Sequence, residues 1–381
     1  MQDYCCDPSH EHNVVTSGGK HAVALIDANP AHQKEVSDAL LSFYEVDNYQ
    51  SADDALTGLK ASIPALILVG KKLASGGGVE FIYMVRHEPA FADIPIIYIV
   101  EQDDSKSAVS IAKAHAAGAN DHLIKPYRRS MLINTISGQL NSQVERNWEI
   151  LPQVQQEALK GTVSVFNGIA DVISSGHPLP FGEVRNACAP LVEAINNHDF
   201  KGILNGVRDH DNYTYAHSMR VATLLSLFGH AAGLKGEDQM VLASGGLLHD
   251  VGKMLIPHHV LNKPGRLNED ELAIMKSHVP ETVKYLQACA DIPKAVLTIA
   301  EQHHEKLDGS GYPYGLKGAQ LNELARMAAI VDIFSALTDR RVYKPPMEAE
   351  KALTIMTDEM SAHIDQHFLK MFKAMLLDAV G

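Results

Sequence analysis

Short apolar runs alternate with segments of helical periodicity between residues 21 and 140, and this alternation limits the folds open to the chain. The apolar runs cover residues 22–26, 65–69 and 95–100, residues 121–125 are expected to form a last short strand, and residues 31–43 have the spacing of a helix. Strands that alternate with helices form βαβ units with parallel strands. The sequence therefore predicts an α/β domain with a doubly wound parallel sheet, whose functional residues lie at the carboxyl ends of the strands.

The rest of the chain, from about residue 128, has a helical pattern. Apolar residues first recur at steps of three or four, at Ile133, Ile136, Leu140, Val144, Trp148 and Leu151. This spacing predicts one long helix that leaves the first domain and ends or kinks at Pro152. Its apolar seam either packs on the chain's own domains or forms the contact of a homodimer.

These patterns divide the chain into four expected segments. They are an N-terminal tail over residues 1–20, the α/β domain over 21–140, a helical linker over 141–195 and an all-α domain over 196–381. We therefore expect a multidomain protein in which a long helix joins an α/β half to a helical half.

Charge and hydropathy exclude two kinds of partner. The formal charge is −13, from 33 Lys and Arg against 46 Asp and Glu, so no basic excess is available to coat DNA. No apolar run approaches the ~18 residues of a membrane helix, and the first twenty residues lack an apolar signal-peptide core. The four cysteines show no metal-ligand spacing. We expect a cytoplasmic protein that binds neither DNA nor a membrane.

Histidines and aspartates are spread over the helical half, each in a different predicted helix or at its edge. The candidates are His217, His249, Asp250, His278, His303, His304 and Asp332. Taken singly, such a histidine is more often packed or on the surface. An aspartate inside an apolar helix such as residues 324–337, however, is costly unless it is paired or binds a metal.

Together these side chains are typical of a metal centre. Imidazole and carboxylate ligands suit first-row ions such as Fe, Mn, Zn or Ni. The candidates are too many for one tetrahedral site, whereas two ions that share a bridging carboxylate would use them all. Two ions a few Å apart are a known device for phosphoester hydrolysis.

Residues 21–140 resemble the receiver domain of response regulators. The match consists of Asp27 after the first predicted strand and of Lys125, followed by proline, after the last. The second acidic residue, the phosphoacceptor and the hydroxyl residue of receivers are replaced by Ala28, Gly70 and Val100. Glycine has no carboxylate to phosphorylate, and one aspartate makes a poor Mg²⁺ site. The resemblance implies a degenerate receiver without a phosphoacceptor, which serves as a regulatory or dimerisation module.

The helical half, over residues 200–365, resembles the HD-GYP phosphodiesterases, a branch of the HD-domain phosphohydrolases. The motifs in common are Leu-Leu-His-Asp-Val-Gly-Lys at 247–253, Lys-Pro-Gly-Arg-Leu at 263–267, His-His-Glu-Lys-Leu-Asp-Gly-Ser-Gly-Tyr-Pro at 303–313, Gly-Leu-Lys-Gly at 315–318 and the segment 325–337. This resemblance implies hydrolysis of the 3′–5′ phosphodiester bond of cyclic di-GMP to pGpG, or further to GMP.

The resemblance also implies roles for single residues. One metal is expected on His217, His249, Asp250 and Asp332, and the other on His278, His303 and His304, with Asp250 as the bridge. Lys253 would contact the scissile phosphate or assist the leaving group, unless it is a surface lysine. Arg341 and Lys344 would hold the phosphates and guanine of the substrate, unless they only end a helix.

The loop around Gly311 and Tyr312 is expected to border the site. By resemblance, residues 311–313 would also form a contact surface for a diguanylate cyclase or an adaptor protein, and the alternative is a purely structural loop. Some family members carry a glutamate for a third metal one helical turn before the first histidine, where this chain has Tyr213. We therefore expect two ions, Fe or Mn in the first place and Ni or Zn as alternatives.

Two alternatives to the main hypothesis stay open. The degenerate receiver and Tyr213 also suit a protein of low turnover that binds a cyclic dinucleotide and passes the signal on by contacts. The same hydrolysis could also act on cyclic GMP-AMP, because nothing in the sequence distinguishes guanine from adenine.

Overall fold

The computed structural model describes residues 22–102, 107–175, 177–208, 210, 212–263, 265–289, 291–339 and 347–380. Contacts divide the chain into two compact units. Residues up to Ser142 and the segment Ile256–Leu267 belong to the first unit, and Gln143–Leu255 and the chain from Asn268 belong to the second. No helix of the described ranges combines the length and hydropathy needed to cross a bilayer. The expected N-terminal tail lies outside the described residues.

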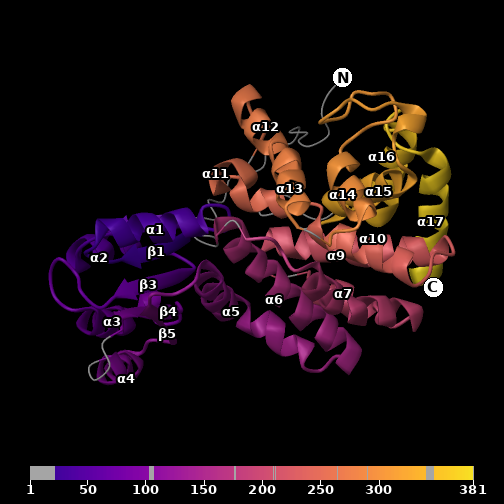
Figure 1. Ribbon diagram of the computed structural model, residues 1–381. Helices are drawn as coiled ribbons and strands as arrows, with labels where there is room; N and C mark the ends of the chain where they lie inside the picture. The colour runs from indigo at the N-terminus through magenta and orange to yellow at the C-terminus, as the bar shows by residue number, and fades with distance from the viewer. Residues whose placement is uncertain are drawn as a thin grey trace. The chain divides into compact units, whose positions relative to one another are not determined.

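The first unit contains a parallel sheet of strand order β2-β1-β3-β4-β5 (Figure 1). Its strands are β1 (Ala22–Ile26), β2 (Glu45–Tyr49), β3 (Leu66–Gly70), β4 (Ile96–Glu101) and β5 (Asp121–Lys125). The helices between and after them are α1 (Pro30–Leu40), α2 (Ala52–Ala61), α3 (Gly78–His87), α4 (Ser107–Ala117) and α5 (Arg129–Trp148), with a short 3₁₀ turn η1 (Pro89–Phe91). This order is that of flavodoxin-like folds, so the predicted doubly wound sheet is confirmed.

Burial explains why the sheet forms here. The central strands β1 and β3 are buried at every residue, as expected of parallel strands covered on both faces. One core cluster packs α2, α3 and α4 against alternate residues of the strands, such as Ile26, Val69 and Tyr98. The edge strand β2 has the polar sequence Glu-Val-Asp-Asn-Tyr and is largely exposed, which is why its sequence gave no strand signal.

The helix α5 runs to Trp148, and α6 (Gln153–Ser175) begins directly after Pro152. The predicted long helix is thus confirmed, but it ends at Trp148, before the expected stop at Pro152, and Leu151 lies outside it. Trp148 is 1% exposed, and its indole N–H donates a hydrogen bond to the carbonyl of Gly206 at 2.8 Å. The end of α5 is therefore packed inside the second unit.

The described residues of the second unit form helices and connecting loops, without a strand. Its helices are α6, α7 (Phe181–Asn196), α8 (Lys201–Gly206), α9 (Tyr213–Ala231), α10 (Glu237–Leu248), α12 (Glu269–Lys276), α13 (His278–Gln287), α14 (Lys294–Gln302), α15 (Glu323–Thr338), α16 (Ala349–Asp358) and α17 (Gln366–Val380), with the 3₁₀ turns η2 (Val251–Leu255) and η3 (Gly318–Gln320). The short helix α11 (His258–Leu261) lies in the segment grouped with the first unit.

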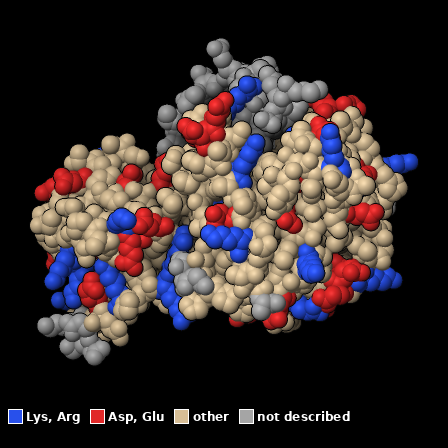
Figure 2. Space-filling view, turned by 45° about the horizontal axis from the view of Figure 1, so that its top comes forward, with Lys and Arg blue, Asp and Glu red and all other residues tan. Residues whose placement is uncertain are grey.

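Helices α9 and α10 form the centre of the second unit, and α14 and α15 pack against them. A Cβ atom at Gly246 of α10 would lie 2.6 Å from Cα of Ala222 on α9, so only glycine permits this close crossing. On the surface, acidic and basic side chains alternate over the face shown in Figure 2. The close packing of α9 and α10 thus brings the ends of several neighbouring helices next to this helix pair.

Candidate metal centre

Five helices of the second unit bring the seven candidate histidines and aspartates together. His217 lies on α9 and Asp332 on α15, whereas the others stand at helix ends: His249 and His303 cap α10 and α14, and His278 begins α13. All are buried except His304, whose side chain is 24% exposed. Residues that are more than a hundred positions apart in the sequence therefore share one interior site.

The ligand atoms of these residues form two groups of four. One group is His217, His249, Asp250 and Asp332, and the other is Asp250, His278, His303 and His304. Within each group, the atoms that could bind an ion lie within 4.8 Å of one another. Asp250 is the member that the two groups share.

The two carboxylate oxygens of Asp250 face different histidines. Its Oδ1 lies 3.1 Å from Nε2 of His278 and 3.7 Å from Nε2 of His303. Its Oδ2 lies 3.2 Å from Nε2 of His249 and 3.7 Å from Nε2 of His217. A carboxylate with one oxygen in each group has the geometry of a bridging ligand.

The other ring nitrogen of three histidines is fixed by a backbone carbonyl three residues earlier. The Nδ1 pairs are His249 with Gly246 at 2.7 Å, His278 with Met275 at 2.6 Å, and His303 with Ala300 at 2.9 Å. Since a carbonyl can only accept, Nδ1 carries a proton and Nε2 faces into the cluster, where it can bind an ion in the neutral form of the ring.

Four atoms at the centre of the cluster are buried and lack a hydrogen bond from any described residue. They are Nε2 of His249, His278 and His303, and Oδ1 of Asp250. Buried polar atoms are normally satisfied, and converging lone pairs of imidazole and carboxylate are satisfied by a cation. The donor set therefore fits a divalent transition metal.

The carboxylates attract positive charge strongly. Burial alone would lower the pKa of His249, but Asp250 and Asp332 raise it to about 10. Burial would raise the pKa of Asp250, yet His249 and Lys253 hold it well below its ordinary value. Without a bound ion, protons on the imidazoles thus balance the negative charge of the two aspartates, which a metal ion would balance when bound.

Lys253 lies beside this centre. Its ammonium pairs with Oδ2 of Asp250, and its side chain is 18% exposed. Burial would lower its pKa, but Asp250 and Asp332 raise it, so the amine carries a positive charge at neutral pH. Lys253 is therefore a largely buried, charged side chain next to the ligands, and not a surface lysine.

The loop after His304 covers one side of the cluster. The ring of Tyr312 stacks on that of His304 at 4.8 Å, and Nζ of Lys276 lies 5.1 Å from the Tyr312 ring centroid. A Cβ atom at Gly311 would lie 2.4 Å from the backbone nitrogen of Lys306, so the loop has no space for a side chain there. Arg341 and Lys344 lie outside the described residues.

Glu305, which was not among the expected site residues, holds the loop beside the cluster. Its side chain is buried and accepts backbone hydrogen bonds from Tyr314 at 2.6 Å, Gly315 at 3.1 Å and Leu316 at 3.0 Å. Its position between the paired histidines and the glycine-rich loop was the available signal. Glu305 fixes the loop on which Tyr312 stands.

Comparisons with known proteins agree with both halves. The family described as "Response regulator receiver domain" matches residues 23–137, and the family described as "HD domain" matches residues 203–368. The "Cyclic di-GMP phosphodiesterase response regulator RpfG" of Xanthomonas campestris is 31% identical over 80% of this chain and 73% of its own length. The chain belongs to the HD-GYP family. Divalent metal binding, which HD domains imply, agrees with the buried cluster.

Two other relatives match shorter stretches of the chain. The "Cyclic di-GMP phosphodiesterase PA4108" of Pseudomonas aeruginosa is 38% identical over 45% of this chain, which spans 41% of that relative's length. The "3'3'-cGAMP-specific phosphodiesterase 1" of Vibrio cholerae is 40% identical over 41% of this chain and 36% of its own length. RpfG therefore matches a greater share of this chain than these two relatives do.

In this HD-GYP protein, Asp27 lies at the carboxyl ends of the strands, where its carboxylate contacts a histidine, a lysine and a backbone N–H group. His32 Nδ1 lies 2.7 Å and Lys125 Nζ lies 3.4 Å from its Oδ2, and the backbone N–H of Asn29 donates to its Oδ1 at 2.8 Å. Burial would raise the pKa of Asp27, but these contacts hold it below its ordinary value. Asp27 is thus fully engaged without a bound Mg²⁺.

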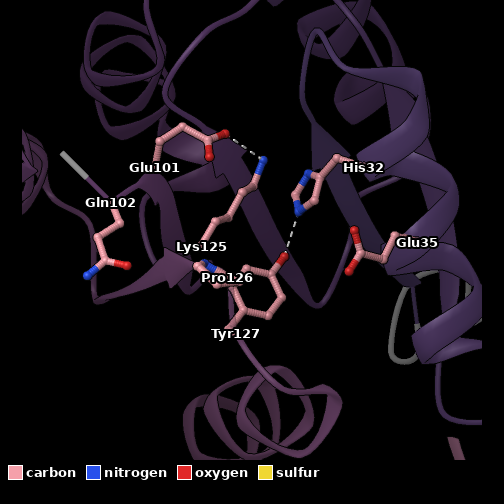
Figure 3. Close-up of a pocket in the computed structure, with 7 residues that line it drawn as sticks. All are labelled: His32, Glu35, Glu101, Gln102, Lys125, Pro126 and Tyr127. Atoms are coloured by element: carbon pink, nitrogen blue, oxygen red, sulfur yellow. Dashed lines mark hydrogen bonds and ion pairs between the residues drawn. The ribbon is translucent and has the colours of Figure 1, made fainter. Parts of the chain in front are cut away.

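A pocket of about 460 Å³ opens beside this network (Figure 3). In it, Nε2 of His32 bonds the Tyr127 hydroxyl at 2.6 Å, and Lys125 pairs with Glu101 at 3.2 Å. A Cβ atom at Gly70 would lie 2.8 Å from Oδ2 of Asp27, so the expected phosphoacceptor position lacks a carboxylate, and a side chain there would have to displace that of Asp27.

Proposed function

We propose that this protein is a metal-dependent phosphodiesterase that hydrolyses the 3′–5′ phosphodiester bond of cyclic di-GMP to pGpG. The observation that carries the proposal is the pair of four-ligand groups that share Asp250. Two divalent ions in these groups, Fe or Mn in the first place, would polarise the phosphate and lower the pKa of a water molecule. The name of the RpfG relative supports cyclic di-GMP as the substrate.

The chain's own residues have defined tasks in this proposal. The charged ammonium of Lys253, next to Asp250, would hold an anionic phosphate oxygen by a charge-assisted hydrogen bond. The Tyr312 ring, stacked on His304, would border the bound nucleotide, and Gly311 keeps the loop close to the ligands. Arg341 and Lys344 stay predicted contacts of the substrate's phosphates and guanine.

The setting of the activity is part of the same proposal. Cys188 and Cys289 are buried free thiols, which suits the reducing cytoplasm. The receiver would act by contacts, as a dimerisation or regulatory module, because Gly70 cannot be phosphorylated. The loop at residues 311–313 would offer a surface to a diguanylate cyclase or an adaptor protein.

A direct assay tests the proposal. The purified protein is loaded anaerobically with Mn²⁺ or Fe²⁺, incubated with cyclic di-GMP and analysed by chromatography for pGpG. Metal content is measured in parallel for the wild type and for Asp250→Ala. We expect two ions per chain and pGpG from the wild type, and neither from the variant, because Asp250 belongs to both groups.

Each other outcome has a definite meaning. If the protein binds ions but forms no product from any cyclic dinucleotide, the result would favour the alternative, a protein that binds the nucleotide and signals by contacts. Faster cleavage of cyclic GMP-AMP than of cyclic di-GMP would change the substrate, an alternative that the named Vibrio cholerae relative supports. A wild-type chain that retains no transition metal would contradict the proposal as a whole.

A further inference from the structure

His217 differs from the three histidines that donate to backbone carbonyls, because its outer nitrogen faces a carboxylate. Its Nδ1 lies 3.1 Å from Oδ2 of Asp339, and its Nε2 lies 2.9 Å from Oδ1 of Asp332. The two aspartates are seven residues apart, which is two turns of α15 and its cap, so they project from the same face. The imidazole is therefore held between two carboxylates.

Asp339 is itself fixed on both sides. Its backbone N–H donates to the carbonyl of Ser335 at 2.8 Å, the last hydrogen bond of α15. Its second oxygen, Oδ1, lies 3.0 Å from Nη1 of Arg220. The carboxylate thus offers one oxygen to the imidazole and the other to a guanidinium.

Arg220 joins this arrangement to the helix that carries His217. It stands three residues after His217 on α9, so the two side chains lie on one face of the helix. Its Nη2 also donates to Oγ1 of Thr338 at 2.7 Å. Helices α9 and α15 are therefore linked by four polar contacts next to one group of ligands.

We propose that Asp339, held by Arg220, is a positioning residue for the metal ligand His217. The carboxylate accepts the Nδ1 proton, which leaves the Nε2 lone pair free, and it fixes the plane of the ring toward Asp332 and Asp250. Without it, the ring can rotate and carry its proton on Nε2, where no ion can bind. The inference rests on the proposed function only in that the cluster binds metal.

The position of Asp339 predicts an effect on one ion alone. The ring that Asp339 contacts, His217, belongs to the group with His249, Asp250 and Asp332, whereas His278 and His303 of the other group are held by backbone carbonyls. Loss of such an outer carboxylate typically weakens a metal by about 10- to 100-fold. We expect this loss at the His217 group and an unchanged affinity at the group with His278.

The test compares Asp339→Asn with a matched variant, Asp365→Asn. Asp365 pairs with Arg326 at 3.2 Å at similar exposure (17% against 12% for Asp339) and belongs to neither ligand group. Zn²⁺ is titrated into the full-length proteins in competition with a chelator, so that each ion has its own affinity. Asp339→Asn should weaken one of two ions, Arg220→Gln should do so to a smaller extent, and Asp365→Asn should match the wild type.

A second measurement separates positioning from general damage to the fold. In a His217→Ala background, adding Asp339→Asn should change neither affinity further, because Asp339 acts through that ring. Equal weakening of both ions, a wild-type affinity profile in Asp339→Asn, or an added loss in the double variant would each overturn the inference. A wild type that binds no Zn²⁺ would instead overturn the proposed function together with it.

Discussion

At the scale of single residues, the cluster is a balance between two buried carboxylates and five imidazoles. The pKa values of Asp250 and Asp332 lie well below the ordinary range, so both stay charged at neutral pH although they are buried. The pKa of His304 is well below its ordinary value because of burial and the nearby His303, so its ring is neutral and ready to bind an ion. Burial would lower the pKa values of His249 and His217, but the carboxylates raise both.

This balance predicts that metal binding depends on pH. The pKa of His249 is about 10 in the ion-free protein, so its proton has to leave when a metal binds. Affinity should therefore rise with pH between pH 6 and pH 8, with release of protons. Calorimetry of Zn²⁺ binding in two buffers of different ionisation enthalpy measures the number released. An affinity that is constant over this range, with no proton release, would contradict the prediction.

The ion-free protein should show the linked effect on stability. The pKa of His249 is raised in the folded protein, so its protonated ring increases the free energy of unfolding. This increase is complete below the unfolded pKa of about 6.5 and is lost as the pH rises toward 10.

A second prediction concerns Glu305, whose carboxylate accepts three backbone N–H groups of the loop. Glu305→Ala should lower the free energy of unfolding by about 1–3 kcal/mol, since three part-buried backbone hydrogen bonds to one carboxylate are lost. The matched control is Glu301→Ala, one helical turn earlier, whose carboxylate bonds only the exposed Tyr314 hydroxyl. Urea denaturation of both variants measures the difference, and an equal effect of the two would contradict the assigned role.

At the scale of elements, the ends of β3 and β1 show what surrounds Gly70, the expected phosphoacceptor position. In the register of the sheet, Val69 is paired with Ile26, so the next residues, Gly70 and Asp27, stand side by side at the carboxyl edge. His32 of α1 and Lys125 of β5 fill the space around Asp27. Three elements therefore hold one charge in place without phosphate or Mg²⁺.

This packing predicts that Gly70→Asp will not restore a response to phosphate. A Cβ atom there lies 2.8 Å from Oδ2 of Asp27, so the substitution should cost about 1–3 kcal/mol of stability through crowding. Gly138→Asp in α5, where a Cβ atom meets open space, is the control for an added aspartate. Thermal unfolding measures stability, and acetyl phosphate followed by the phosphodiesterase assay measures the response. A restored response at wild-type stability would contradict this account of the site.

The sequence predicted elements best where a pattern is local. Buried strands such as β1 and β3, and the stop of α5 before Pro152, follow from hydropathy and from one proline. The edge strand β2 could not be predicted because half-exposed polar residues carry no period-2 signal. The motifs around His249 and His303 predicted the family of the helical half.

The parts of the site that were missed depend on tertiary contact. Asp339 meets His217 across 122 positions, and only the pairing of α9 with α15 brings them together. Its spacing of two helical turns from Asp332 was a usable signal, but a spacing alone does not show which ring lies between. Glu305 stood within a quoted motif, yet its role depends on how the loop folds back over its own carboxylate.

At the scale of the whole molecule, all seven candidate ligands lie in the second unit. His217, His249 and Asp250 belong to Gln143–Leu255, and the remaining ligands belong to the chain from Asn268. The second unit also contains its own core, which includes α9, α10 and α15. Metal binding should therefore be a property of this unit alone.

Deletion of residues 1–127, which leaves the whole of α5, tests this division. We expect the shortened chain to retain two ions, while its assembly or turnover changes because the receiver is lost. Metal analysis of the shortened and full-length proteins, each with its Asp250→Ala variant as a blank, measures retention. Loss of metal from the shortened chain would show that the ligands depend on the first unit.

Trp148 gives this two-unit molecule a spectroscopic asymmetry. It is the chain's single tryptophan, and its indole is enclosed at the start of the second unit. Tryptophan fluorescence therefore reports the unfolding of the helical half, while the receiver contains no tryptophan and does not contribute to it. A fluorescence trace and a circular dichroism trace recorded on one sample would thus separate the two transitions without any label.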